Sequence, residues 1–404
     1  MVLDAIKARP LVTVCETPQH TTFPDNVDNS TPMVGWAPHS PRTVNVPVAN
    51  EASSRRLLDA IRDGDEDLGC RLVHDSSIDI NAEGNIPAVD LPSDERQWGP
   101  QQWTPLLYAA SLNRSKIITS LLACPHIDIY RYRGRDAIFR AARFDHAEAY
   151  MALSSHPEIQ HWYPDFNHEL LHFTLDGKKN CVRVLAQHPI TDVNFIDTEL
   201  EELFIGSALH VACNKGDADI VRLLLACDRV DVAKQTRYGM TGLQFACLHG
   251  FEDVVRVLLE LSPPEKLLPT DHDKQALHVA AIQGHVGVLQ LLLATGWFDV
   301  NATNWQGLTP LHCAITNNRL DVVLALLESN EIDVNRFQEK TKQTALHMAS
   351  IQGHANIVQA LLGCKAIDVA FPDREGKTAL DSAINGTNCE VLAAFEAAEV
   401  VKSQ

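Results

Sequence analysis

The sequence lacks the signatures by which many enzymes are identified. It contains no glycine-rich loop of the kind that holds nucleotide phosphates, no dinucleotide-binding fingerprint and no protein-kinase signature. Its 10 cysteines never occur in a Cys-x-x-Cys pair, the spacing typical of zinc and redox sites. We therefore expect no cofactor and no metal.

Basic residues and long apolar runs are also scarce. Lysine and arginine number 34 against 52 aspartates and glutamates, for a net charge of -18. This balance argues against nucleic-acid and anionic-membrane partners, because both require clusters of positive charge. No apolar run is long enough to span a bilayer. Asp4 and Lys7 interrupt the segment where a secretory signal would be apolar. We expect a protein of the reducing cytoplasm or nucleus.

What the sequence does contain is an internal repeat. Residues 274–306 have close copies on both sides, and one leucine recurs at the same place in each copy. These anchor leucines are Leu209, Leu243, Leu277, Leu311, Leu346 and Leu380, which lie 34, 34, 34, 35 and 34 residues apart. A fixed period of this length predicts a row of stacked supersecondary units.

Each unit is predicted to form two short antiparallel helices followed by a hairpin-like loop. Thr309 suits the N-cap of a first helix and Pro310 its first turn. Seven residues after each anchor, a residue type that tolerates positive φ should end that helix. Those residues are Gly64, Asn113, Asp145, Gly216, Gly250, Gly284, Asn318 and Gly353. An apolar second helix follows, as in residues 220–225, and then a β-prone segment leads to the next unit.

The motifs TPLH at 309–312, TALH at 344–347 and ALHVAAIQGH at 276–285 closely resemble the ankyrin repeat. The resemblance is close over 206–404 and weaker upstream, where Leu57, Leu106, Ile138 and Leu171 take the anchor position. It implies an all-α repeat solenoid of about ten helix-turn-helix units with hairpin loops. It also implies hydrogen bonds that stabilise the repeats, made by His210, His278, His312 and His347.

Residues 1–50 share nothing with the repeat, so we expect an N-terminal arm followed by a solenoid over 51–404. The arm is rich in proline, which disfavours long helices, but it is too apolar for a simple solvated tail. Two interpretations remain open. The arm either is a flexible cap on the first repeat or lies in the groove of the array.

Positions two, five and six after each anchor are expected to face a concave groove. The binding residues predicted in this way are Tyr108, Arg140, Arg143, Phe173, Asn214, Phe245, Leu248, His249, Ile282, Gln283, Met348 and Ile351. Such an apolar wall would need a cover, which a protein partner, the arm or a small molecule could provide. Aromatic residues at the predicted hairpin tips are a second recognition feature. They include Tyr132, Trp162, Tyr163 and Trp305, with Phe337 and Phe371 further along.

One segment matches a zinc-protease motif by chance. Residues 168–172 fit His-Glu-x-x-His, in which two histidines one helical turn apart bind zinc. The repeat register places His168 before the start of its helix, which would separate the two rings. We therefore predict that His172 belongs to the scaffold and that no metal binds here.

Two functional hypotheses follow. The first is a protein-interaction scaffold that binds a partner protein through the groove and the hairpin tips. The second is a cofactor-independent enzyme of specialised metabolism, such as an isomerase, cyclase or lyase, with a small-molecule site closed by the arm. Its candidate catalytic residues are Tyr108, Arg140, Lys215 and His249, which would bind and polarise a substrate by acid-base chemistry.

Overall fold

The computed structural model describes residues 51–86, 102–129, 135–160, 166–197, 206–268, 275–386 and 388–402. The predicted arm, 1–50, lies outside these described residues.

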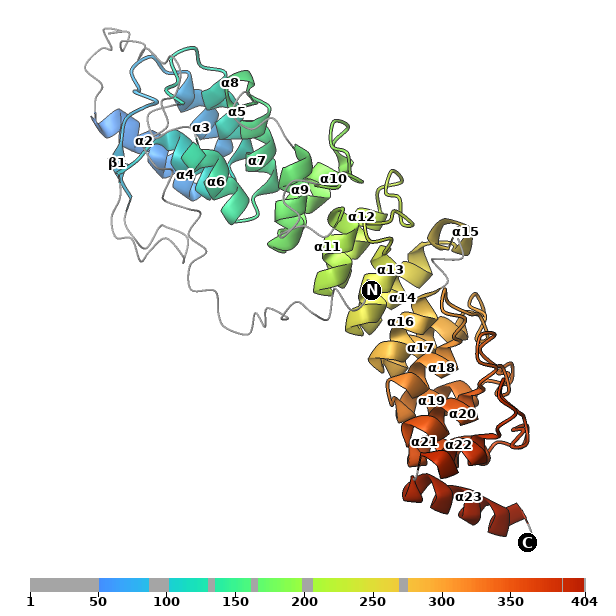
Figure 1. Cartoon of the computed structure of the whole chain (residues 1–404). Coiled ribbons are helices and arrows are strands. Elements are labelled where there is room, and N and C mark those ends of the chain that lie inside the picture. Colours follow the sequence, from blue (N-terminus) through green and yellow to red (C-terminus); the bar gives the residue numbers. More distant parts are fainter. Residues whose placement is uncertain are drawn as a thin grey trace, which may run out of the picture.

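The described chain forms a row of helix pairs (Figure 1). The first helices of the pairs are α2 (Glu51–Asp63), α4 (Pro105–Ser111), α6 (Arg135–Arg143), α9 (Phe166–Leu175), α11 (Ala208–Lys215), α13 (Gly242–His249), α16 (Ala276–Gln283), α18 (Pro310–Thr316), α20 (Ala345–Gln352) and α22 (Ala379–Asn385). The second helices are α3 (Glu66–Val73), α5 (Ser115–Leu122), α7 (Ala147–Ser154), α10 (Lys179–Gln187), α12 (Ala218–Leu225), α14 (Glu252–Leu261), α17 (Val286–Ala294), α19 (Leu320–Leu327), α21 (Ala355–Leu362) and α23 (Cys389–Lys402). Two short helices, α8 (Pro157–Gln160) and α15 (Pro264–Leu267), lie in connections between pairs.

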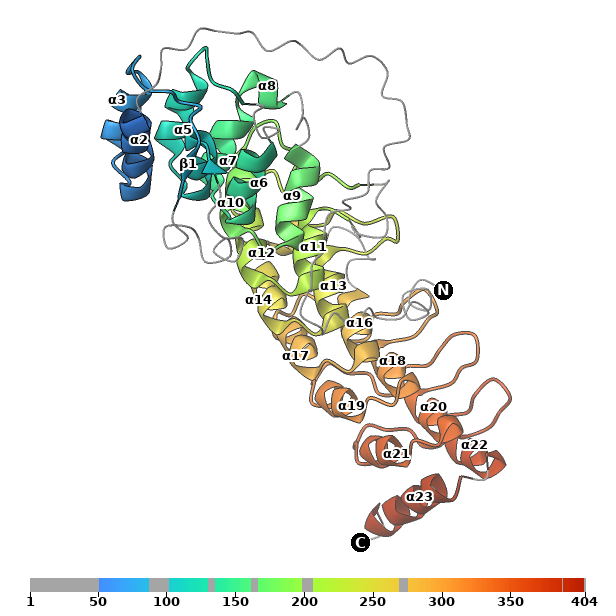
Figure 2. The ribbon, with the colours of Figure 1, turned by 90° about the vertical axis from the view of Figure 1, so that its left-hand side faces the viewer.

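First helices pack on first helices and second helices on second helices, which gives two layers along one elongated axis (Figure 2). Each pair buries its apolar side chains against its own partner helix and the neighbouring units, as a solenoid requires. The predicted helical repeat solenoid is confirmed. The described chain adds one small sheet, in which β1 (Gly84–Asn85) pairs antiparallel with β2 (Gln102–Trp103) at the two ends of the first insertion.

The helix ends follow the local sequence. The Thr309 hydroxyl caps α18, with Pro310 in its first turn, as predicted. All eight residues predicted to end the first helices have positive φ. Two of them also serve the next unit. The Asn113 side-chain oxygen accepts from the Ala149 amide at 3.1 Å, and the Asp145 carboxylate accepts from the Asn180 and Cys181 amides at 3.0 and 2.9 Å. These contacts cap α7 and α10, whose own N-cap side chains make no capping hydrogen bond.

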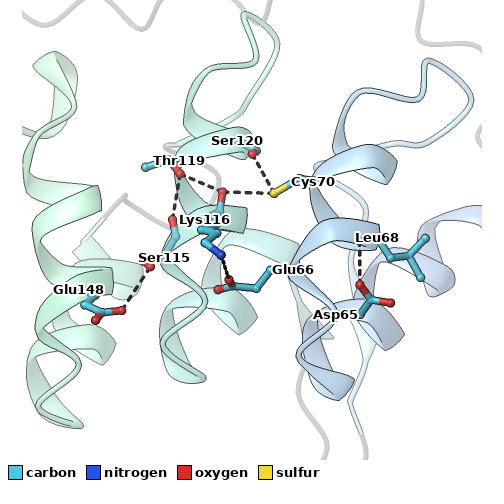
Figure 3. Close-up of polar contacts among 9 residues, drawn as sticks. All are labelled: Asp65, Glu66, Leu68, Cys70, Ser115, Lys116, Thr119, Ser120 and Glu148. Atoms are coloured by element: carbon cyan, nitrogen blue, oxygen red, sulfur yellow. Dashed lines mark hydrogen bonds and ion pairs between the residues drawn. The ribbon is translucent and has the colours of Figure 1, made fainter.

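Polar contacts also join the second helices at the N-terminal end of the row (Figure 3). The Lys116 ammonium on α5 lies 3.1 Å from the Glu66 carboxylate on α3. The Ser120 hydroxyl donates to the Cys70 sulfur at 3.2 Å, across the same two helices. Because Lys116 is largely exposed, its ion pair contributes little net stability.

Buried histidines tie first helices to the following loops in the C-terminal units. The His347 Nδ1 accepts from the Thr344 amide at 3.3 Å, and Nε2 lies 3.1 Å from the Lys377 carbonyl, to which it donates as Nε2–H. The same threonine or serine partnership occurs at His210 and His312. Burial lowers the pKa of His210 and of His312 to about 4, so both rings are neutral near pH 7. Each of the four histidines named from the sequence resemblance forms at least one hydrogen bond within its unit or to the following loop.

Candidate interaction surface

The predicted groove wall is accessible at only some of its positions. Tyr108, Phe173 and Phe245, all two residues after an anchor, are buried. Their rings pack edge-to-face at centroid distances of 5.9 Å on Trp103, 5.1 Å on Tyr150 and 6.0 Å on His210, respectively. The prediction that these three rings form an open apolar wall is therefore wrong. Phe173 and Phe245 contact rings of a neighbouring unit, and Tyr108 contacts a ring of its own unit, so all three fill the interior of the stack.

Positions five and six after the anchor are more accessible. Asn214, Leu248, His249, Ile282 and Gln283 are half-buried, as is Met348 at position two. Arg143 and Ile351 are exposed, and Ile351 keeps 47% of its surface in solvent. The accessible part of the first-helix layer thus comes from the ends of these helices.

His249 has a structural partner in the preceding unit. Its Nε2 lies 2.9 Å from the Asn214 side-chain oxygen, to which a neutral ring donates as Nε2–H. The ring stacks on Phe251 with centroids 5.6 Å apart. Burial is the main cause that lowers the pKa of His249, and the nearby His285 lowers it further. These contacts hold the imidazole in place and favour its neutral form.

The four candidate catalytic side chains do not form one cluster. Tyr108 is buried on α4, and the guanidinium of Arg140 on α6 lies 4.2 Å above the ring of Trp103. The Lys215 ammonium on α11 donates to the Leu175 carbonyl at 2.5 Å. Figure 1 shows α4 and α6 separated from α13, which carries His249, by the pairs α9/α10 and α11/α12. The structure thus gives no support to a shared acid-base site.

The His-Glu-x-x-His segment lies inside one helix. Because α9 begins at Phe166, both His168 and His172 are helical, and the prediction that His168 precedes the helix is wrong. His168 Nε2 is 3.2 Å from the carboxylate of Asp197, a buried residue in the following loop. Burial is the largest cause that lowers the pKa of His172. Within the described ranges, no three His, Cys, Asp or Glu residues are grouped to hold a metal ion.

The hairpin tips at the C-terminal end form a continuous surface. Of the predicted tip residues, Tyr132, Trp162 and Tyr163 lie outside the described residues. Trp305 is 71% exposed and Phe337 is 38% exposed, and the Phe337 ring stacks on that of Phe371 with centroids 5.5 Å apart. We call the three tips at 303–308, 336–343 and 371–377 the tip ledge.

Hydrogen bonds between neighbouring hairpins hold the tip ledge together. The Gln338 side-chain amide donates to the Gln306 carbonyl at 3.1 Å. The Arg374 backbone amide donates to the Thr341 carbonyl at 3.0 Å, and its guanidinium donates to the Lys340 carbonyl at 2.9 Å. The main chain of the ledge is therefore fixed, and its side chains project from a rigid base.

A family model of ankyrin repeats in three copies matches residues 170–266, 261–338 and 334–402, more than half of the chain. The chain belongs to the ankyrin repeat family. Ankyrin repeat domains are generally protein-interaction modules, so a protein partner is the general expectation for this chain.

Two curated proteins show local similarity to this ankyrin-repeat chain. Alpha-latrotoxin-Lg1a of Latrodectus geometricus is 32% identical over 97 residues, 24% of this chain and 7% of that protein. NAD-dependent deacetylase sir2B of Dictyostelium discoideum is 39% identical over 64 residues, 16% of this chain and 7% of that protein. The chain thus spans about 7% of the length of either relative.

Two solved ankyrin repeat domains are similar in structure. That of Bcl-3, a unique member of the IkappaB protein family, has a TM-score of 0.49 and 27% identity, and the match covers 56% of this chain and 97% of that one. That of human ASB11 has a TM-score of 0.46 and 27% identity, with 56% and 96% covered. In the described part of the ankyrin-repeat chain, no helix is both long and apolar enough to cross a membrane.

Part of the accessible surface of this ankyrin-repeat chain was not predicted from the sequence. It comprises Ile384, which is 54% exposed on α22, and the lysines of the tip ledge, Lys340 and Lys342. One signal was available for the lysines. The single 35-residue step, from Leu311 to Leu346, contains an extra residue in the hairpin that carries both of them.

Proposed function

We propose that this chain is a protein-interaction scaffold that binds a partner protein through the accessible ends of its first helices and through its hairpin tips. The observation that carries the proposal is the exposure of large apolar side chains in the C-terminal units. Ile351 on α20 and Ile384 on α22 are about half exposed, and Trp305 is more exposed still. Ile351 and Ile384 lie on the packed neighbouring helices α20 and α22, and apolar surface on adjacent elements is a feature of interaction sites, where tryptophan is also enriched.

The half-buried groove residues support the same proposal. Leu248, Ile282 and Met348 contact the core and also present apolar surface beside the polar Asn214 and Gln283. A surface of mixed apolar and polar side chains is typical of protein interfaces. Because these side chains lie on helices, little conformational entropy would be lost when a partner binds. In this proposal His249 positions Asn214 and takes no part in catalysis.

The test is co-purification with variants matched in chemistry. The baits would be the unmodified 404-residue chain, an Ile351→Lys/Ile384→Lys variant and a Leu261→Lys/Leu324→Lys control, each added to an extract of the cells that express the chain. Leu261 and Leu324 are about half exposed on the second helices α14 and α19. We expect partner proteins to co-purify in stoichiometric amounts with the wild type and with the Leu261→Lys/Leu324→Lys control. The same partners should be lost with the Ile351→Lys/Ile384→Lys variant. Equal recovery by all three baits would contradict the proposal.

A further inference from the structure

One hairpin of the tip ledge carries a net positive charge although the whole chain is acidic. The hairpin at 336–343 contains three basic residues, Arg336, Lys340 and Lys342, and one acidic residue, Glu339, in a chain of net charge -18. All four are exposed, and no ion pair among the described residues involves their side chains. The hairpin therefore carries a local excess of positive charge that the described chain does not neutralise.

The acidic residues of the neighbouring tip are already engaged. The Glu375 carboxylate lies 2.7 Å from the Lys377 ammonium. The Asp373 carboxylate accepts from the backbone amides of Glu375 and Lys377 at 2.8 and 2.9 Å, inside its own turn. Neither carboxylate forms an ion pair with a basic side chain of the 336–343 hairpin in the described part of the chain.

Lys342 occupies a backbone position that favours glycine. The corresponding residues of the other C-terminal turns are Gly239, Gly307 and Gly376, with φ between 73° and 79°, and Lys342 has φ of 56°. A residue with a Cβ in this conformation costs about 1 kcal/mol or more. Strain of this kind persists where the surrounding structure enforces it and is concentrated at functional sites. Here the bonds from Lys342 to Gln338 and from Gln338 to Gln343 enforce it.

We propose that the tip ledge binds an extended, acidic segment of a partner protein that also carries large apolar side chains. Carboxylates of the segment would pair with Lys340, Lys342 and Arg336, and its apolar side chains would pack on Trp305 and on the stacked rings of Phe337 and Phe371. The inference rests on the proposed function and names the class of partner. Figure 2 shows the C-terminal loops projecting together along one side of the first helices, as a lengthwise ligand would require.

A nucleic acid is the less suitable ligand, although aromatic and basic side chains also bind single strands. A polyanion needs a continuous basic track, and the ledge has one hairpin with a net excess of two positive charges on a strongly acidic chain. A short acidic segment presents few charges and fits this limited site.

The experiment uses the full chain and a random 16-residue peptide display library. We expect enriched peptides with net negative charge and at least one aromatic or large aliphatic residue. The most enriched peptide, labelled with fluorescein, would then be titrated with each variant by fluorescence anisotropy at physiological salt. A fluorescein-labelled 20-nucleotide single-stranded DNA would be titrated in parallel.

The charge-reversed variant Lys340→Glu/Lys342→Glu should weaken peptide binding by about tenfold or more, and Trp305→Ala by about tenfold. Lys340→Gln/Lys342→Gln should weaken it by about threefold to tenfold. The matched control Arg256→Glu/Lys365→Glu makes the same charge change at exposed positions outside the ledge and should alter binding less than about twofold. Unchanged thermal midpoints would show that the variants fold.

Several results would overturn the inference. In the library, the inference fails if basic or neutral peptides are enriched or if no peptide is enriched. In the titrations, it fails if the charge-reversed variant binds the peptide as tightly as the wild type, or if the wild type binds the DNA more tightly than the peptide. Peptides that bind the ledge variants normally but fail to bind Ile351→Lys/Ile384→Lys would reject the ledge and leave the proposed function intact. Partners that co-purify equally with every bait would reject the proposed function itself.

Discussion

The units at 51–197 and those at 206–402, here called the N-terminal and C-terminal regions, reach the same architecture by different chemistry. The N-terminal region buries Trp103, Tyr108, Tyr150 and Phe173 between its helices and has no Thr-x-x-His box. The C-terminal region joins its first helices to the following loops through buried histidines such as His347. A stack of helix pairs requires close packing between its helices and hydrogen-bonded backbone groups. Large aromatic rings supply the packing in the N-terminal region, and buried histidines supply hydrogen bonds to the backbone in the C-terminal region.

The largest expected difference between the two regions is their response to acid. Burial holds the pKa of His210 and His312 at about 4, below the value of about 6.5 in an unfolded chain. Unfolding therefore takes up protons, so the stabilisation is complete above pH 6.5 and decreases as pH falls towards 4. The two histidines together should cost about 5 kcal/mol between pH 7 and pH 4.5.

Hydrogen exchange at pH 7, 5.5 and 4.5, corrected for intrinsic rates, would locate this loss. We expect the C-terminal region to lose protection first, because a solenoid opens unit by unit. The N-terminal region has a histidine with a lowered pKa in His172, but this residue is only half-buried. Earlier loss of protection in the N-terminal region would contradict the comparison.

The next largest effect concerns aromatic packing in the N-terminal region. Trp103 is almost fully buried, so Trp103→Ala should destabilise the chain by about 3–5 kcal/mol through lost contacts and a residual cavity. Trp305→Ala removes an exposed ring and should cost less than about 0.5 kcal/mol. Urea unfolding measures the free energy of unfolding of both variants. Similar losses of stability in the two variants would contradict the difference in burial between Trp103 and Trp305.

The histidine box gives the third effect. His347→Ala removes the ring nitrogen that accepts from the Thr344 amide and leaves the Lys377 carbonyl without the Nε2–H donor, which should cost about 2 kcal/mol. His347→Gln should cost less, because Gln244 already fills this position in another unit. There its side-chain oxygen accepts from the Thr241 amide at 3.0 Å. If glutamine proved as damaging as alanine in denaturant unfolding, the hydrogen bond to the Thr344 amide would not be the source of the stability.

The fourth effect tests the links between units in the N-terminal region. Asp145→Gly keeps the positive φ but removes the acceptor for the Asn180 and Cys181 amides, at an expected cost of about 1.5 kcal/mol. Asp145→Asn should cost less than Asp145→Gly, because its single side-chain oxygen can still accept from one of the two amides. Thermal unfolding of the two variants measures the difference, and a neutral glycine variant would assign Asp145 to the turn alone.

Sequence periodicity predicted the fold well because it reports directly on burial. The anchor leucines, the Thr309 cap and the left-handed residues from Gly64 to Gly353 are local features, and the structure confirms them. The start of α9 was not predictable from register. That unit has no threonine cap to end the helix towards its N-terminus, so the helix extends back to Phe166.

The accessible surface was less predictable because it depends on contacts between units. Tyr108 and Phe173 occupy the same repeat position as the half-buried Met348, but each of the two rings is covered by an aromatic neighbour from outside its own helix, Trp103 and Tyr150 respectively. The stacking of Phe337 on Phe371 likewise joins residues of consecutive hairpins. A repeat alignment gives positions within one unit and leaves such cross-unit contacts undetermined.

The smallest expected effect distinguishes the strained lysine of the tip ledge from the glycines in the same turn position. Lys342→Gly should stabilise the chain by about 0.5–1 kcal/mol, because relief of the left-handed strain exceeds the added freedom of glycine in the unfolded state. Lys342→Gln keeps the Cβ and should leave stability unchanged. Chemical denaturation measures both variants, and peptide binding should weaken in both. A residue that serves recognition can be retained although it lowers the stability of the fold. If the glycine variant were neither more stable nor weaker in peptide binding, Lys342 would therefore be an ordinary turn residue.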